Sequence, residues 1–566
     1  MIKVAKKSPA DCLSYITGEG KTTVGFVKDN NSPWPYPMTL MAPSDTLLGV
    51  TGRILARPQI AYSGGLTVEV DGRFQPNRPR TAPGTWNLVG DLHYTKPGTM
   101  PKKWAMLRIN PWDEVNERCI SGRKTAYEYQ DDVPPSMRKR GIRIDGSEPE
   151  SRLFYDEVNY DGSAEQSKLD IVGRKIAQLA HGDPKNKIPK NEFLLITLPN
   201  KDKVLYNYVK RIADVEVGIR NVCLNQAQFQ KFEDQYVDNV WLKVNLKLGG
   251  TNHVLRNPPD LLKKDRRVMI VGLDVTHPSP GSSDSAPSIA GMVANYDSDL
   301  GQWPAAWAFQ QKSKEEVAGK RSETVQKLLK QHLNRWHDKN NGTLPDKILV
   351  YRDGVSEGQF QLVRDNEVTA IQQACAETYA ELAPPGSKLP KITVVVVVKR
   401  HHTRFFVKKD VETRSAEVKK LRAQGLDPAN MRLRGPDGNP VAGTAVGTGV
   451  TGKFLWEFFL QAHAPLQGVA RPAQYVVVYD EIFRAKRDGT NIPVYANPAG
   501  ELEKVTHALC YVFGRTTGAI GVAAPARLAD LVCDRARIYN AGVYGNEEEG
   551  THRTVHKNLE ECMYYI

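Results

Sequence analysis

The sequence contains little cysteine, no long apolar run and no internal repeat. Its 7 cysteines among 566 residues form no CxxC pair, which argues against a structural zinc site and favours reduced thiols in a reducing compartment. No stretch approaches the roughly 20 apolar residues of a membrane span, and the start, MIKVAKKSPADC, lacks the apolar run of a secretory signal. We therefore expect a protein of the cytoplasm, or alternatively of the nucleus, with no membrane partner.

Acidic residues are outnumbered, with 64 Asp and Glu against 77 Lys and Arg, for a formal charge of +13. This balance favours an anionic partner, with nucleic acid ahead of a membrane surface; the alternative is a basic protein that is merely soluble. The composition, 40% hydrophobic and 25% charged, is that of a globular protein. Because the chain is too long for one hydrophobic core, we expect two or three domains.

Three regions follow from the patterning. Residues 1–100 are rich in proline and glycine with short strand-like pieces, which indicates an irregular linker packed on something larger. In residues 101–255 strands and helices alternate, as in a doubly wound α/β domain. The stretch RNPPDLLKKDRR marks the boundary to a second α/β domain, residues 256–566.

Both α/β domains contain apolar segments of strand length and segments with helical periodicity. In the first domain we expect strands at 103–110 and 191–199 and helices at 201–214 and 232–250. In the second domain we expect strands at 266–275, 346–354, 391–402 and 473–481, helices near 314–338, 357–382 and 524–540, and a long loop at 425–449.

Two aspartates end apolar strands in the second domain. Asp274 follows RRVMIVGL, and Asp353 follows ILVYR and precedes a glycine turn. Carboxyl ends of strands in one open sheet can converge at the ligand crevice, where two carboxylates repel each other unless a proton or cation lies between them. A hard divalent ion such as Mg²⁺ suits such a pair. The alternative is that each aspartate only caps the turn after its strand.

The ordered motifs GLDVTHP, YRDGVSEGQF and KRHHTRFF resemble the PIWI domain of eukaryotic Argonaute proteins, and WLKVNLKLGGTNHVL resembles the end of the preceding MID domain. The opening VTGRILARPQIAYSGG resembles the linker before MID, so the resemblance covers about 45–566. It implies a Rossmann-like MID domain followed by an RNase H-like PIWI domain. The family's N-terminal and PAZ domains are not recognisable, so a C-terminal lobe is expected.

The resemblance also implies Mg²⁺-dependent cleavage, with Mn²⁺ as an alternative ion, of a target RNA paired to a small guide RNA. Asp274 and Asp353 match the first two family carboxylates, and Asp530 stands at the usual histidine position of the fourth. The loop glutamate matches Glu315, with Glu316 as its rival. Asp274, Asp353 and Asp530 are the expected metal ligands.

A pocket for the guide 5′ phosphate is implied by position. Tyr206 and Lys210 are four residues apart, as are Lys243 and Lys247, so each pair shares one helix face. Taken alone, the two later lysines would be read as cations near a helix C-terminus. Arg535 matches the PIWI arginine of this pocket; Arg515 is a weaker candidate.

Several positions depart from the family pattern or stay open. Where relatives often have glutamine in the phosphate pocket this chain has Val222, and Asn221 is the expected substitute. Arg527 replaces a tyrosine near the final helix. His401 and His402 point to opposite sides of a strand, so we expect structural or substrate-facing roles for them rather than shared metal binding.

The sequence therefore predicts a small-RNA-guided endoribonuclease that binds guide and target RNA, with silencing-complex proteins as further partners. One alternative is a non-catalytic guide-binding platform that recruits partners. Another is an RNase H-like nuclease that needs no guide, against which the predicted phosphate pocket argues.

Overall fold

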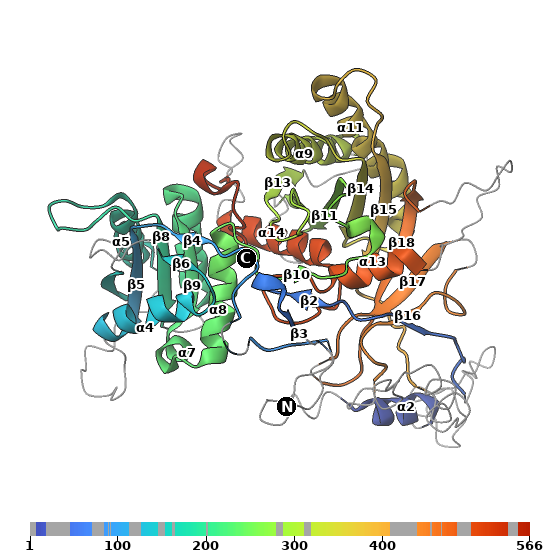
Figure 1. The fold of residues 1–566 in the computed structure, drawn as a ribbon, viewed down its shortest axis with the longest axis horizontal. Coiled ribbons are helices and arrows are strands. Elements are labelled where there is room, and N and C mark those ends of the chain that lie inside the picture. Colours follow the sequence, from blue (N-terminus) through green and yellow to red (C-terminus); the bar gives the residue numbers. More distant parts are fainter. Residues whose placement is uncertain are drawn as a thin grey trace, which may run out of the picture.

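The computed structural model describes residues 7–18, 46–68, 70, 84–88, 90, 92–111, 126–144, 153–160, 165–199, 202–278, 287–310, 318–407, 439–452, 455–465, 467–483, 500–540 and 553–566. These residues form two α/β units, one on a four-stranded and one on a nine-stranded sheet, with the C-terminus at their junction (Figure 1). Within these ranges no helix has both the length and the apolar character needed to cross a membrane.

The first unit is a parallel sheet in the order β7-β5-β8-β9. Alternate strand residues face opposite sides: Met106 and Leu195 belong to one core cluster, and Leu107 and Ile196 to another. Helices cover both faces, which confirms the Rossmann-like expectation. The elements are β5 (Trp104–Pro111), α4 (Ala126–Arg138), β7 (Phe154–Tyr160), α5 (Gln166–His181), β8 (Phe193–Leu198), α6 (Lys203–Arg211), a π-helix (Ile212–Val217), β9 (Arg220–Asn225), α7 (Gln226–Lys231) and α8 (Asp234–Lys247).

The second unit is a mixed sheet in the order β1-β16-β17-β18-β15-β14-β11-β12-β13. Only β11, β14 and β15 run parallel to one another; the other neighbours are antiparallel. The strands are β1 (Arg53–Ile54), β11 (Val268–Thr276), β12 (Ser288–Ala294), β13 (Ala305–Gln310), β14 (Lys347–Asp353), β15 (Lys391–Val398), β16 (Thr444–Val446), β17 (Trp456–Gln461) and β18 (Ala473–Asp480).

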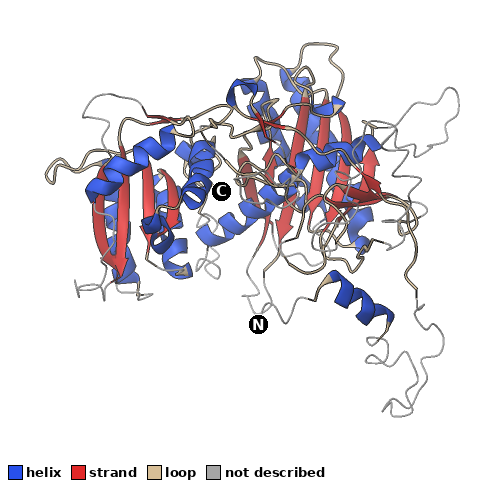
Figure 2. Cartoon of the chain, turned by 60° about the horizontal axis from the view of Figure 1, so that its bottom comes forward, coloured by secondary structure: helices blue, strands red, loops and turns tan. Residues whose placement is uncertain are grey.

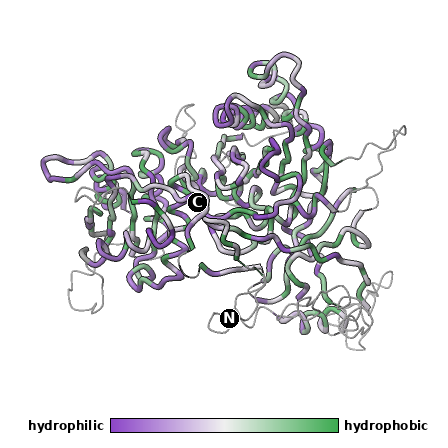
Figure 3. Tube along the Cα trace, in the orientation of Figure 1, coloured by the Kyte–Doolittle hydropathy of each residue, from purple (hydrophilic) through white to green (hydrophobic). Residues whose placement is uncertain are grey.

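Helices lie on both faces of this sheet (Figure 2). On one face α14 (Ala524–Tyr539) and α13 (Glu501–Leu509) join the large core cluster, and on the other α9 (Ala318–Lys339) and α11 (Val368–Leu382) join a second one. The apolar stretches of the chain, green in Figure 3, coincide with the interiors of the strands. Seven consecutive residues of β15, Ile392–Val398, are buried, and all but Thr393 are hydrophobic, because both faces of the strand are covered.

Two short strands from the expected linker region pair with later parts of the chain. β1 extends the nine-stranded sheet by pairing with β16, and the short β2 pairs with a strand that follows the first unit. Outside these sheets and their covering helices lie α2 (Pro9–Thr17), β2 (Ile60–Ala61), β3 (Thr67–Val68), β4 (Thr99–Met100), β6 (Arg143–Ile144), β10 (Val254–Leu255) and 3₁₀ turns at Ser63–Gly65, Asp260–Leu262 and Lys557–Leu559.

The predicted strands and the helix at 524–540 are confirmed within a few residues, whereas two other expectations need correction. The loop expected at 425–449 is wrong for Thr444–Val446, which form β16 between β1 and β17; residues 425–438 lie outside the described part. The helix expected at 357–382 is broken into a 3₁₀ turn (Glu357–Gln359), a short helix α10 (Phe360–Leu362), a π-helix (Val363–Glu367) and α11.

Helix α14 lies unusually close to β11 at Gly272. A Cβ atom at this position would lie 2.0 Å from the Pro525 carbonyl oxygen in the first turn of α14. Only a glycine allows this approach, because any side chain would collide with backbone that cannot move alone. The distance at which α14 packs on the sheet therefore depends on one glycine.

Gly272→Ala should lower the free energy of unfolding by about 1–3 kcal/mol or more, the range for overpacking in a filled core. The melting temperature of the full chain, measured by circular dichroism, checks this. Gly358→Ala is the matched control, since no atom lies within 4 Å of its Cβ position; equal melting temperatures for the two variants would contradict the close approach.

Candidate functional site

Asp274, Asp353 and Asp530 form an acidic edge at the carboxyl ends of the central strands. Asp274 lies near the end of β11 and Asp353 ends the neighbouring parallel strand β14. Asp530 comes from α14, which packs across β11 and β12. All three line one cavity of about 1090 Å³. The structure thus brings the three predicted aspartates to one place.

The first two aspartates are buried, with exposed fractions of 7% for Asp274 and 1% for Asp353. The turn after Asp353 makes room for both, because Gly354 has φ +78° and a Cβ there would lie 2.8 Å from Asp274 Oδ1. Asp353 Oδ1 accepts a hydrogen bond from the Gly354 amide at 2.8 Å. A glycine is required here both by the left-handed conformation and by the close carboxylate.

Burial raises the pKa of Asp274 to about 6, and the Asp353 carboxylate adds to the shift. Burial also raises the pKa of Asp353, although Lys399 opposes that shift. The cause is common to both, since a buried carboxylate next to other carboxylates is disfavoured in its charged form. The acidic edge is therefore a site where an added cation would be held favourably.

Basic side chains already contact the acidic edge. Lys399 Nζ forms an ion pair with Asp353 Oδ2 and lies 3.7 Å from Asp530 Oδ2. Arg527, one turn before Asp530 on α14, also pairs with it. Arg352 donates to the Asp353 carbonyl oxygen and is itself held by Glu367 at 2.8 Å and 2.9 Å. Lys399 and Arg352 were not among the predicted site residues.

The chemistry of the donors fits a hard divalent ion, because all three side chains offer carboxylate oxygens and line the same cavity. In the described part of the chain, however, no group of three His, Cys, Asp or Glu side chains is arranged to hold a metal ion. Glu315 and Glu316 lie outside the described residues. The metal set therefore stays a prediction.

The two histidines after β15 have different surroundings. His401 Nε2 bonds the Pro472 carbonyl at 2.7 Å and its ring meets Phe459 edge to face. Both His401 and His402 line the cavity of the acidic edge. The structural or substrate-facing roles expected for the two histidines stay predictions.

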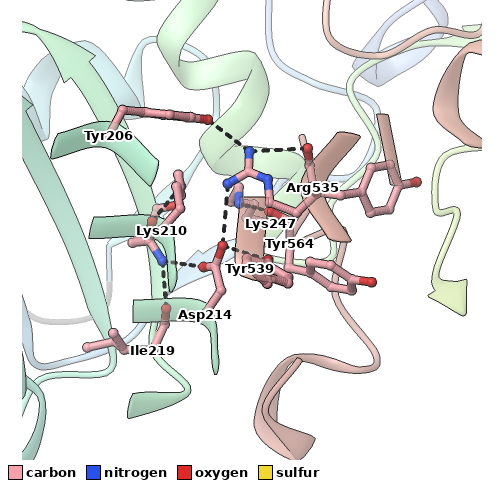
Figure 4. Close-up of polar contacts among 10 residues, drawn as sticks. Tyr206, Lys210, Asp214, Ile219, Lys247, Arg535, Tyr539 and Tyr564 are labelled. Carbon is pink, nitrogen blue, oxygen red and sulfur yellow. Dashed lines mark hydrogen bonds and ion pairs between the residues drawn. The ribbon is translucent and has the colours of Figure 1, made fainter. Parts of the chain in front are cut away.

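Tyr206, Lys210, Lys247 and Arg535 lie close together between the two units (Figure 4). Lys243, one turn before Lys247 on α8, is near enough for Lys210 and Arg535 to affect its charge, and the five residues are named the basic pocket. The first two lie on α6, the two later lysines on α8, and the arginine on α14. Arg535 donates to the Tyr206 hydroxyl at 2.9 Å across the junction. Lys210, Lys247 and Arg535 are buried.

Burial lowers the pKa of Lys247 to about 7 and that of Lys243 to about 8, and the Lys210 ammonium contributes to both shifts. Arg515 also lowers the pKa of Lys243, which places this weaker candidate close to the pocket. The basic side chains are thus packed close together although their positive charges repel one another. An anion bound among them would reduce this repulsion.

Asp214 is the acidic side chain at the centre of Figure 4, and sequence reasoning missed it. Its Oδ2 accepts from the Tyr539 hydroxyl at 2.8 Å and pairs with Arg535 at 3.4 Å. Asp214 lies four residues after Lys210, on the π-helix that continues α6. That spacing is the signal that could have found it, since i and i+4 residues share a face.

Lys247 and Arg535 also contact the end of the chain. Lys247 Nζ donates to the Tyr564 carbonyl at 2.6 Å, and Arg535 lies 3.4 Å from the Tyr565 carbonyl. Both are contacts of a side chain with a backbone carbonyl, between residues 317 and 30 positions apart. No local pattern in the sequence predicts them.

Asn221 replaces only in part the glutamine that relatives often have in the phosphate pocket. Val222 is buried in the core of the first unit. Asn221 is also buried, and both of its amide hydrogens are used, by Asp214 at 2.7 Å and the Ile219 carbonyl at 2.9 Å. Its Oδ1 accepts from Lys210 at 2.5 Å. Asn221 therefore orients pocket residues rather than offering a free donor.

Comparison with known proteins gives a consistent result. Residues 193–541 match the Piwi domain family. The chain is 34% identical over 376 residues to Protein argonaute 5 of Arabidopsis thaliana, covering 63% of this chain and 33% of the plant protein. It spans less than half the length of the curated relatives compared, 33% of one and 42% of another.

Two solved structures share the fold. The Kluyveromyces polysporus Argonaute with a guide RNA aligns with a TM-score of 0.68 at 25% identity, covering 91% of this chain and 57% of that chain. The MID-PIWI domains of N. crassa QDE-2 align with a TM-score of 0.55 at 28% identity, covering 84% of this chain and 100% of that chain.

Asp274→Asn should raise the melting temperature of the metal-free protein at pH 7.5. Because the folded pKa of about 6 exceeds the unfolded value of about 3.9, the folded state loses stability as pH rises through this window. Removing the charge should raise the free energy of unfolding by about 1–3 kcal/mol at pH 7.5 and by almost nothing at pH 4.

Thermal melts in EDTA across pH 4–8 test this, with the exposed Asp265→Asn as control. A gain for Asp274→Asn that does not shrink as pH falls from 6 to 4 would show that the charge is not responsible.

Proposed function

This chain belongs to the Argonaute family of Piwi-domain proteins, and on that premise we propose that it is a small-RNA-guided endoribonuclease. It binds the guide 5′ phosphate in the basic pocket and cleaves the paired target RNA at the acidic edge with Mg²⁺. The observation that carries the proposal is the convergence of three aspartates from β11, β14 and α14 on one cavity.

The basic pocket suits a terminal phosphate. A 5′ phosphate carries more negative charge than an internal phosphodiester and offers several acceptor oxygens, so lysine and arginine donors placed around it make charge-assisted hydrogen bonds. Arg535 joins Tyr206 across the junction. Guide binding therefore also holds the two units together.

At the acidic edge, Asp274, Asp353 and Asp530 would hold the metal, together with the loop glutamate at Glu315 or Glu316. Mg²⁺, when bound, supplies a Lewis acid that activates water and stabilises the leaving oxygen of a phosphodiester. Hydrolysis then leaves 3′-hydroxyl and 5′-phosphate ends. The strand order fixes the two buried aspartates, while Asp530 is carried by a helix and is partly exposed.

Base pairing with the guide selects the target, so the protein need hold only backbone and duplex shape. We extend the proposal to Mn²⁺ as a substitute ion, to silencing-complex proteins as further partners, and to the cytoplasm, with the nucleus as the alternative site of action.

A non-catalytic guide-binding platform is the second candidate. It is favoured by the ion pair of Lys399 with Asp353, which places an ammonium among the carboxylates. The presence of all three aspartates weighs against it, since a platform needs none of them.

Asp274→Ala should reduce cleavage of a guide-complementary RNA in Mg²⁺ by at least about 100-fold. Even mutation of a residue that only hydrogen-bonds a metal ligand lowers metal affinity or activity by about 10- to 100-fold. A labelled target, a 5′-phosphorylated guide and the full chain suffice for a single-turnover assay. Asp265→Ala, an exposed aspartate just before β11 that does not line the cavity, serves as the control. Guide binding without any cleavage by the unmodified chain would favour the platform.

Affinity for a 5′-phosphorylated guide should fall as pH rises from 7 to 9. Lys247 and Lys243, with pKa values of about 7 and 8, lose protons in this window, and phosphate binding must restore them, while the phosphate stays dianionic above its second pKa of about 6. Binding should therefore take up protons, as calorimetry in buffers of different ionisation enthalpy can measure.

A 5′-hydroxyl guide is the matched control and should show a weaker pH dependence. Lys247→Met should reduce the preference for the phosphorylated guide by about 10- to 100-fold, because hydrogen bonds to charged groups contribute about 1.5–3 kcal/mol. An equal affinity of the unmodified chain for both guides would contradict the pocket assignment.

A further inference from the structure

Lys399 occupies the centre of the acidic edge. Its Nζ pairs with Asp353 Oδ2 and lies 3.7 Å from Asp530 Oδ2, and the charge of Asp274 also acts on it. Burial alone would lower its pKa, but the Asp353 and Asp530 carboxylates raise it above the ordinary value. The side chain therefore carries a positive charge among three carboxylates.

The sheet places Lys399 there. Val397, near the end of β15, is the register partner of Asp353 on β14, and Val398 pairs with β18 on the other side. Lys399 is the next residue and leaves the sheet at the same edge as the carboxylate. Its position follows from the strand register and not from a mobile loop.

Other cations cannot easily replace it. Arg352 is held by a two-point contact with Glu367 and bonds the Asp353 carbonyl oxygen, so its charge acts on Asp274 and Asp353 without an ion pair to either carboxylate. Arg527 pairs with Asp530, whose side chain is 25% exposed, and not with the buried Asp353. Asp353, with only 1% of its surface exposed, relies on Lys399 for charge compensation.

A divalent ion and the Lys399 ammonium exclude each other. Mg²⁺ binds carboxylate oxygens at about 2.0–2.1 Å in a strict octahedron, so an ion on Asp353 Oδ2 would take the space that Nζ fills. Lysine has a flexible stem, its side chain is 38% exposed, and the adjoining cavity of about 1090 Å³ offers room. Displacement is therefore feasible without moving the strands.

We propose that Lys399 is a resident counter-ion that stabilises the metal-free acidic edge and must swing out before a divalent ion binds, so that it sets the metal requirement of the protein. This inference rests on the proposed metal-dependent function. If the lysine-out conformer is populated about 10% of the time, the apparent ion affinity falls about tenfold.

The test is calorimetric titration of Mn²⁺, and of Mg²⁺ alone, into the chelator-treated full chain and its Lys399→Met variant. The variant should bind the ion about tenfold more tightly, because the competing ammonium is absent. Lys391→Met, at the exposed start of the same strand, is the matched control and should leave the affinity unchanged. Equal or weaker ion binding by Lys399→Met would overturn the proposal.

Thermal melts supply a second readout that needs no catalysis. In EDTA, Lys399→Met should melt several degrees below Lys391→Met, because a buried carboxylate has lost its cation, and saturating Mg²⁺ should remove most of that difference. Lys399→Gln, which keeps a hydrogen-bond donor without the charge, should behave in the same way and replaces Lys399→Met if the latter does not fold. A variant as stable in EDTA as the control would contradict the counter-ion role.

The two proposals fail in different ways. Absence of ion binding by both the unmodified chain and Lys399→Met would overturn the metal-dependent function. Binding of the ion by both with the same affinity would overturn only the role of Lys399.

Discussion

The close packing of α14 against β11 at Gly272 is the constraint on which both candidate sites depend. A side chain at this position would meet the Pro525 carbonyl, so the absence of a Cβ sets the height of the helix above the sheet. Asp530 and Arg535 are five residues apart on that helix. The first reaches the acidic edge and the second reaches the basic pocket, so one packing distance positions a residue in each.

The two sites follow the same electrostatic logic with opposite signs. Each gathers like charges in partly or fully buried surroundings, where the charged forms are disfavoured: the pKa of Asp274 rises to about 6 and that of Lys247 falls to about 7. In each, one side chain of the opposite sign is already in place, Lys399 among the carboxylates and Asp214 among the cations. Such sites are held at a cost in stability that a ligand of opposite charge offsets.

Much of the fold could be predicted from local pattern. Strands β11, β14, β15 and β18 are long apolar runs between turn signals, and their carboxyl ends locate Asp274 and Asp353. The strands β12 (SIAGMVA) and β13 (AAWAFQ) cannot be recognised as easily from the sequence, because glycine, serine and alanine give weak strand signals. β16 lies in a glycine-rich stretch that reads as loop, and its strand state comes from pairing with β1, almost 400 residues earlier.

The order of the motifs, the aspartate at the end of each central strand, and the four-residue spacing of Tyr206 with Lys210 and of Lys243 with Lys247 were determined by the sequence itself, because each depends on neighbours within one element. Tertiary structure alone decided that Lys399 lies on Asp353, that Asp214 pairs with Arg535, and that Lys247 meets the Tyr564 carbonyl. These contacts join strands, helices and a chain end that are tens to hundreds of residues apart. No local periodicity encodes such distances, since they are set by strand register and by how closely a helix can approach a sheet.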